Sequence, residues 1–144
     1  MAKLKFPPTL AELLEEFQEL PDWDERYDYL IDLGKQLPAV PTEMQTEANL
    51  VRGCMSTVWL ATELTPTTPP RLKIVADSDS LIVKGLIVVL LAVFNNLTPA
   101  EILQTNEADV MNRLGLSQHL SPQRRNGLFA MVKRIKQLAL EHAV

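Results

Sequence analysis

The sequence predicts an α+β domain in which a small antiparallel sheet of about three strands is flanked by N-terminal and C-terminal helices. Three observations lead to this fold class. Helix-start signals with apolar stripes lie near both ends of the chain, and a stretch rich in β-branched residues lies between them. The 144 residues, 47% of them hydrophobic, are enough to bury one core, so we expect a single domain over residues 1–144.

Two helix-start signals occur in the N-terminal region. Thr9 followed three residues later by Glu12 has the pattern of a capping box, and Pro21 ends this first helix. Asp22 begins a second helix with the same kind of signal, and Gly34 is placed to close it in a left-handed cap.

The middle of the chain has the composition of extended structure. Residues Asn49 to Leu64 are rich in β-branched and aromatic side chains, and Arg71 to Ala76 supply another strand. The Thr- and Pro-rich segment 65–70 forms a loop between them, which makes the two strands antiparallel neighbours. Because Gly53 tolerates a positive φ, we expect a sharp turn that places Cys54 at or beside a bend between two strands.

Helices are expected again in the C-terminal half. The apolar stretch Leu81–Phe94, interrupted only by Lys84 and Gly85, is longer than a typical strand and predicts a buried helix. It is too short for the ~20 residues of a membrane-spanning helix, so no membrane interaction is expected. Thr98 and Ser121 each precede a proline at the first helical position and mark the start of two further helices.

Composition narrows the function classes. The 14 basic and 18 acidic residues give a net charge of −4, which argues against nucleic acid as a partner. The single cysteine forms no internal disulfide, and with no secretory signal pattern we expect a reducing cytoplasm. Neither metal-ligand spacings of Cys and His nor phosphate- or dinucleotide-binding loops occur, so we expect no metal or cofactor.

Cys54 is the candidate reactive residue. A lone cysteine is most often a small buried hydrophobic residue, but the turn at Gly53 and the neighbouring Arg52 favour a reactive thiol, since turns are exposed and a cation stabilises a thiolate. A thiolate accepts or passes on sulfur by exchange without a metal. The chain has no recognisable apparatus for extracting sulfur from an amino acid, so a partner enzyme must supply it.

Three segments carry motifs that occur together, in this order, in one known family. Residues 51–60 read VRGCMSTVWL, residues 76–86 read ADSDSLIVKGL and residues 120–128 read LSPQRRNGL. They resemble the V-x-G-C-x-S-x-V-W, D-S-D-x-x-I-V-K-G-L and L-[ST]-P-x-R-x-x-G-L segments of the SufE proteins, the sulfur acceptors of cysteine desulfurases in iron–sulfur cluster assembly. The family's N-terminal pattern is resembled by Pro21, Trp23, Arg26, Tyr27 and Leu30.

The resemblance implies a fold shared with IscU-type scaffolds and a defined function. Cys54 is then expected to accept a persulfide sulfur from a SufS-like cysteine desulfurase, to stimulate that enzyme, and to pass the sulfur to a SufBCD-type scaffold. Pyridoxal phosphate stays on the desulfurase, so this chain is a sulfurtransferase-type accessory protein with no stand-alone turnover. With one cysteine in place of a ligand set, it is not expected to hold a cluster itself.

The site expected from this resemblance is a cysteine loop with its partner contacts. Besides Cys54, its residues are Arg52, Gly53, Met55, Asp79 and Arg124. Asp79 occupies a family position that affects docking and the cysteine loop, whereas the local sequence favours helix capping; one side chain can do both. Arg124 contacts the cysteine loop or the partner, or else it is a solvated side chain in the first turn of the last helix.

The sequence leaves alternatives open. The protein is either a persulfide carrier or an allosteric activator that binds the desulfurase without carrying sulfur. A thiol-based redox sensor or peroxidase is a third possibility, although it normally needs a second, resolving cysteine. Whether Cys54 is buried at rest is also open. The pKa of its thiol is open too, since burial would raise it and Arg52 would lower it. The oligomeric state, monomer or homodimer, is open as well.

Overall fold

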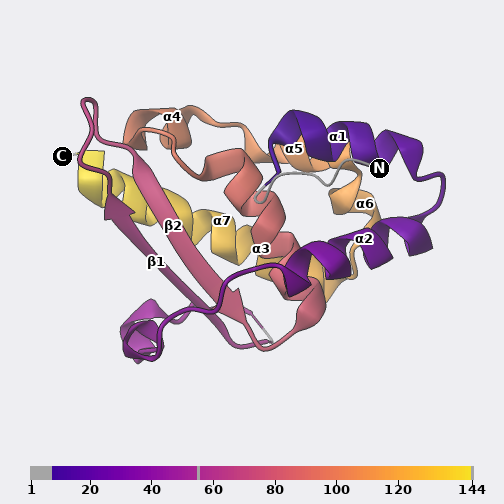
Figure 1. The fold of residues 1–144 in the computed structure, drawn as a ribbon, viewed down its shortest axis with the longest axis horizontal. Coiled ribbons are helices and arrows are strands. Elements are labelled where there is room, and N and C mark those ends of the chain that lie inside the picture. Colours follow the sequence, from indigo (N-terminus) through magenta and orange to yellow (C-terminus); the bar gives the residue numbers. More distant parts are fainter. Residues whose placement is uncertain (1–7, 55, 144) are drawn as a thin grey trace.

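Helices precede and follow one β-hairpin along the chain (Figure 1). This computed structural model describes residues 8–54 and 56–143. Its elements, in order, are α1 Leu10–Glu19, α2 Trp23–Lys35, the 3₁₀ turns η1 Thr42–Met44 and η2 Glu47–Asn49, β1 Val58–Leu64, β2 Leu72–Ser78, α3 Leu81–Phe94, α4 Pro99–Gln104, α5 Glu107–Leu114, α6 Leu116–His119 and α7 Pro122–Ala143. The predicted α+β fold class is confirmed.

The sheet has two strands in the described part of the chain, where the sequence predicts about three. β1 and β2 pair antiparallel along their whole length, residues 58–64 with residues 72–78. The start of the predicted extended region contributes only an isolated bridge between Leu50 and Trp59. The third strand does not form because η2 precedes this bridge and a turn at Gly53 follows it, which leaves too few residues to pair.

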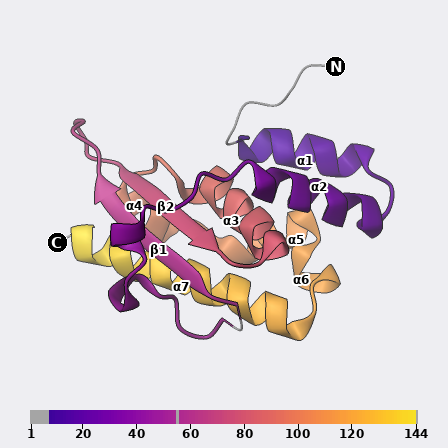
Figure 2. The ribbon, with the colours of Figure 1, turned by 60° about the horizontal axis from the view of Figure 1, so that its bottom comes forward.

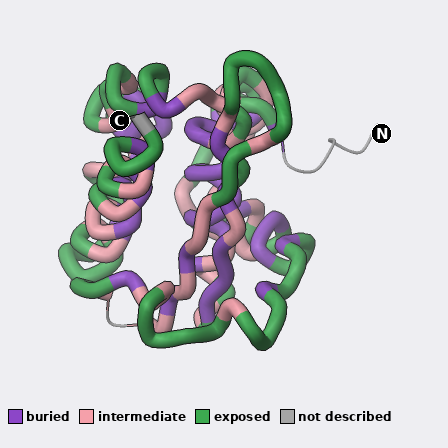
Figure 3. The backbone as a smooth tube through the Cα atoms, turned by 90° about the vertical axis from the view of Figure 1, so that its left-hand side faces the viewer, coloured by how far each residue is buried: buried purple, intermediate pink, exposed green. Residues whose placement is uncertain are grey.

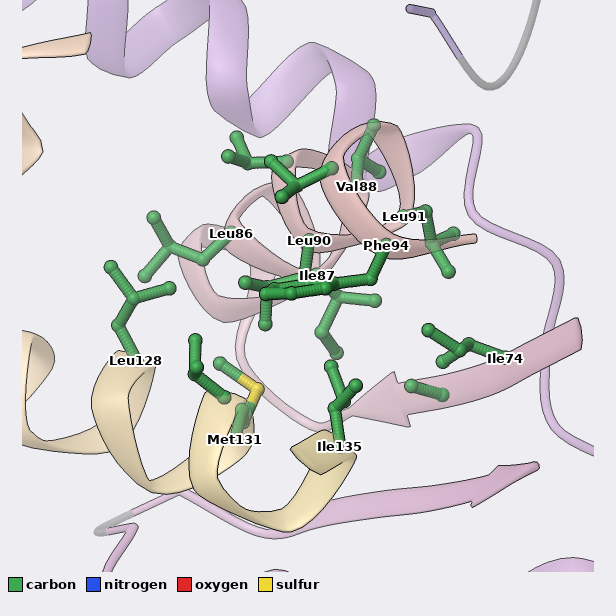
Figure 4. Packing of buried hydrophobic residues seen from close by; sticks show 14 of the residues in the cluster. Ile74, Leu86, Ile87, Val88, Leu90, Leu91, Phe94, Leu128, Met131 and Ile135 are labelled. Carbon is green, nitrogen blue, oxygen red and sulfur yellow. The ribbon is translucent and has the colours of Figure 1, made fainter. Parts of the chain in front are cut away.

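Helix α3 is the centre of the core, as its apolar sequence predicts. It contacts α1, α2, α7 and β2, and in Figure 2 it lies between the α1–α2 pair and α7. The side chains of Leu128, Met131 and Ile135 on α7 point toward it (Figure 4). Buried residues lie on the sides of the hairpin and helices that face each other, and the outer turns are exposed (Figure 3). Burial of this apolar surface is the main stabilising contribution to the fold.

Two glycines let α2 and α3 cross at very short distance. A Cβ built on Gly85 would lie 2.2 Å from the carbonyl oxygen of Leu30, and one built on Gly34 would lie 2.7 Å from that of Leu81. Gly34 is therefore a packing residue inside α2, which continues to Lys35. The predicted left-handed cap at Gly34 is wrong, because a glycine near the end of a helix pattern serves a close crossing as well as a cap.

The helix-start signals are confirmed, and two short helices were not predicted. Cap residues accept a backbone N–H at the starts of α1, α2, α4 and α7, namely Thr9, Asp22, Thr98 and Ser121. The unpredicted helices α5 and α6 meet at Gly115, whose φ is +76°. Asn106 caps α5 by accepting the N–H of Asp109. These starts are read from local sequence because each cap satisfies an N–H that the helix itself leaves unpaired.

Candidate functional site

The cysteine loop, defined here as residues 52–54 and 56–57, lies between the bridged residue Leu50 and the start of β1. Gly53 has a φ of +90°, so the predicted turn is confirmed. The loop bends onto α7, where a Cβ built on Gly53 would lie 3.4 Å from the Cβ of Ala130. In Figure 2 this end of the hairpin lies beside α7. The turn and the small side chain on α7 together bring the loop against the helix.

The Cys54 thiol is half-buried between the cysteine loop and α7. Its Sγ lies 3.6 Å from the carbonyl oxygen of Gly127, to which the S–H donates. A Cβ built on Gly127 would lie 3.7 Å from this sulfur, an ordinary van der Waals distance, so the contact leaves room for a methyl group there. The thiol also borders a cavity of about 330 Å³, whose apolar lining includes Val83, Leu86 and Met131.

Burial decides the protonation state of the thiol. Desolvation raises the pKa of Cys54 above its ordinary value. Arg52 does not offset this effect at rest, because its exposed guanidinium lies 3.4 Å from a carboxylate oxygen of Glu47 instead. Of the two opposing effects on the thiol that the sequence leaves unranked, desolvation is therefore the larger. The resting thiol is protonated at neutral pH.

Asp79 holds the second half of the cysteine loop. Its Oδ1 accepts the backbone N–H of Thr57 at 3.2 Å, and its own N–H donates to the carbonyl oxygen of Thr57 at 3.3 Å. Helix α3 is capped by Ser80, which accepts the N–H of Val83. The helix-capping role predicted for Asp79 is wrong, because β2 continues to Ser78 and moves the cap position one residue further along.

The predicted site residues that the structure describes lie in or beside the cysteine loop, although the side chain of one of them turns away from the thiol. Arg124, in the first turn of α7, lines the same cavity as Cys54. Arg52 belongs to the loop but turns toward Glu47, and Met55 lies outside the described residues. Sequence reasoning assigned no role to Gly127 and Ala130. Their signals were the glycine of the third motif, Gly127, and a second small residue three positions later on the same helix.

Residues 8–54 and 56–143 contain neither a metal-binding cluster nor a membrane-spanning helix. No group of three or more His, Cys, Asp or Glu side chains there is arranged to hold a metal ion. Over the same residues, every helix is too short or too polar to cross a bilayer.

Comparison with known proteins decides the family. The SufE model, described as an Fe-S metabolism associated domain, matches residues 11–139. The chain belongs to the SufE family. This membership gives the SufE-like chain a role in iron–sulfur metabolism, and the resemblance drawn from the three sequence motifs is confirmed.

Relatives agree with the SufE assignment, and a solved structure matches the fold. An uncharacterized SufE-like protein of Rhizobium meliloti is 41% identical over 132 residues, which cover 91% of this chain and 94% of the relative. Another from Rhizobium etli is 39% identical over 135 residues, covering 93% and 91%. The solution structure of a hypothetical protein from Thermus thermophilus matches with a TM-score of 0.73 at 20% identity, covering 95% of this chain and 97% of that one. That structure supports the fold.

Proposed function

We propose that this SufE protein accepts sulfur from a SufS-like cysteine desulfurase and carries it as a persulfide on Cys54. The observation that carries this proposal is the position of the thiol. Cys54 lies on a turned loop and borders a cavity of about 330 Å³, in a chain whose family functions in iron–sulfur metabolism. A loop thiol can reach a partner, and a cavity beside it can shelter what it receives.

The transfer step is thiol–disulfide exchange. The Cys54 thiolate attacks the outer sulfur of the persulfide on the desulfurase cysteine. A sulfur–sulfur bond forms at Cys54 as the donor's sulfur–sulfur bond breaks, and its electron pair leaves with the donor cysteine as a thiolate. The outer sulfur keeps its proton, so atoms and charge balance without an added oxidant or reductant. Removal of the persulfide frees the donor cysteine for another turnover, which accounts for stimulation of the desulfurase.

The resting geometry makes loop movement part of this function. With its pKa raised by burial and its sulfur against Gly127, the Cys54 thiol is poorly placed to attack a donor. Outward movement of the loop removes the desolvation and exposes the sulfur. Return of the loaded loop places the outer sulfur, about 2 Å beyond Sγ, in the cavity, where Val83 and Met131 limit access of water-soluble reductants.

The loaded protein then meets its acceptor. We propose a SufBCD-type scaffold in this role, with pyridoxal phosphate confined to the desulfurase. The same exchange chemistry serves delivery, since the acceptor thiolate attacks the outer sulfur on Cys54 and the Cys54 thiolate leaves.

Intact-mass measurement tests the carrier role. We expect incubation with cysteine and the SufS-like desulfurase of the same organism to add one sulfur, ~32 Da, which a thiol reductant removes. Cys54→Ser is expected to show no gain and no stimulation of the desulfurase. Stimulation that survives in Cys54→Ser would replace the carrier by the non-carrying activator.

A further inference from the structure

A second hollow lies on the other side of the cysteine loop. It is a groove of about 640 Å³. One side is formed by residues 47–53, which include η2 and the start of the cysteine loop, and the other side is the outer face of α7. Arg52 and Gly53 line it from the loop, and Ala130, Lys133 and Arg134 line it from α7. Gly53 and Ala130, which face each other where the loop meets α7, both line the groove, so the groove adjoins the contact of the loop with the helix.

The groove is basic in a chain that is acidic overall. It is lined by three cations and by one carboxylate, that of Glu47, while the whole chain carries a net charge of −4. Lys136, one turn along α7, is bound to Glu107 at 2.7 Å. Among the residues that the structure describes, no ion pair engages Lys133 or Arg134. These two cations are available to an acidic partner.

We propose that this groove docks an acidic segment of the sulfur-donating desulfurase. Charge complementarity gives the chemistry of the segment, which must carry Asp or Glu side chains. The donor is favoured over the acceptor because the loading step needs Cys54 itself as the attacking thiolate, which requires the thiol to leave Gly127, whereas in delivery the acceptor thiolate attacks. This inference rests on the proposed function and names the surface through which that function begins.

Docking in the groove is coupled to the loop through Arg52. The Arg52–Glu47 pair is exposed, with side-chain exposures of 77% and 83%, so it is weak and readily exchanged for a carboxylate of the partner. An occupant that binds Arg52 holds the residue two positions before Cys54. If the occupant binds Arg52 more tightly when the loop is away from Gly127, its binding shifts the loop toward that position.

Charge reversal tests the groove. Lys133→Glu combined with Arg134→Glu is expected to raise the dissociation constant of the desulfurase complex roughly tenfold at low salt, with a smaller difference at high salt. Lys73→Glu combined with Arg113→Glu makes the same change of net charge on the remote end of β2 and on α5, and is expected to leave the constant nearly unchanged. Alkylation of Cys54 in the unbound groove variant should match wild type, which shows that its loop is intact.

The outcomes separate this inference from the function on which it rests. At saturating concentration the groove variant is expected to gain one sulfur as wild type does. An unchanged dissociation constant would overturn the groove while sulfur loading of wild type still supports the carrier. Failure of wild type to load, with binding weakened in the variant, would overturn the carrier alone. Normal donor binding with weakened delivery to the scaffold would assign the groove to the acceptor and overturn our choice of the donor.

Discussion

Two close contacts at glycines in this molecule differ in the space that they leave for a side chain. At the crossing of α2 and α3, a Cβ on Gly85 would lie 2.2 Å from a backbone oxygen, so the helices leave no space. Where the cysteine loop rests on α7, a Cβ on Gly127 would lie 3.7 Å from the Cys54 sulfur, which is ordinary contact beside a cavity of about 330 Å³. The crossing therefore holds α2 and α3 in fixed positions, whereas the cysteine loop can leave its contact site on α7, called the seat below.

The difference follows from what each contact buries. The crossing joins two helices of the hydrophobic core, and separating them would expose apolar surface on both. Among its described residues, the loop is held chiefly by two polar contacts, Thr57 with Asp79 and the sulfur with Gly127. Local opening costs little where apolar contacts are few. The thiol can therefore move while the elements around it stay in place.

The largest expected effect comes from filling the crossing. Gly85→Ala is expected to lower the free energy of unfolding by about 3 kcal/mol, because the helices must move apart to admit a methyl group. Gly127→Ala is the matched control, also a glycine in a helix, and is expected to change it by less than about 1 kcal/mol. Urea denaturation monitored by circular dichroism measures both. Equal losses in the two variants would remove the distinction between the crossing and the seat.

Local signals explain why much of the fold and part of the site follow from the sequence. Thr9 caps α1 through a residue three positions away, and Gly53 turns the chain by its own φ, so both are readable from neighbours alone. Gly34 was misassigned because its role depends on α3, about fifty residues further along. Asp79 was assigned to a cap because its partner Thr57 lies 22 residues earlier. Contacts between distant segments leave no local pattern to read.

An intermediate effect, on the reactivity of Cys54, is expected when the hydrogen bond between Asp79 and Thr57 of the cysteine loop is removed. Asp79→Ala removes the acceptor of the Thr57 N–H, a loss of about 1 kcal/mol that should speed alkylation of Cys54 by iodoacetamide roughly fivefold. Asp79→Asn keeps an oxygen at this position and is the matched control, expected to stay near the wild-type rate. The global free energy of unfolding should change little in either variant. An unchanged alkylation rate in Asp79→Ala would mean that the seat on α7 alone holds the loop.

The smallest effect is expected in the pH dependence of stability, through the buried Cys54 thiol. Burial raises the pKa of Cys54 in the folded protein, so the native state keeps the thiol proton to a higher pH than the unfolded chain does. The contribution of this proton to stability is complete below the unfolded pKa, near ~8.5, and is lost as the pH rises toward the higher folded value.

Urea denaturation across this pH range measures the decline, and Cys54→Ser is the control that lacks it. The comparison is needed because burial, followed by Glu16, raises the pKa of Tyr29 to about 12, and this phenol reduces stability at high pH in the same direction. Absorbance of the thiolate gives an independent titration of Cys54, expected above the range of an ordinary cysteine. In Asp79→Ala the same titration should move back toward that range, since a loop that opens more often spends less time desolvated. A thiol that titrates as an ordinary cysteine in wild type would mean that the seat buries it too little to matter, and the contrast with the α2–α3 crossing would then rest on packing alone.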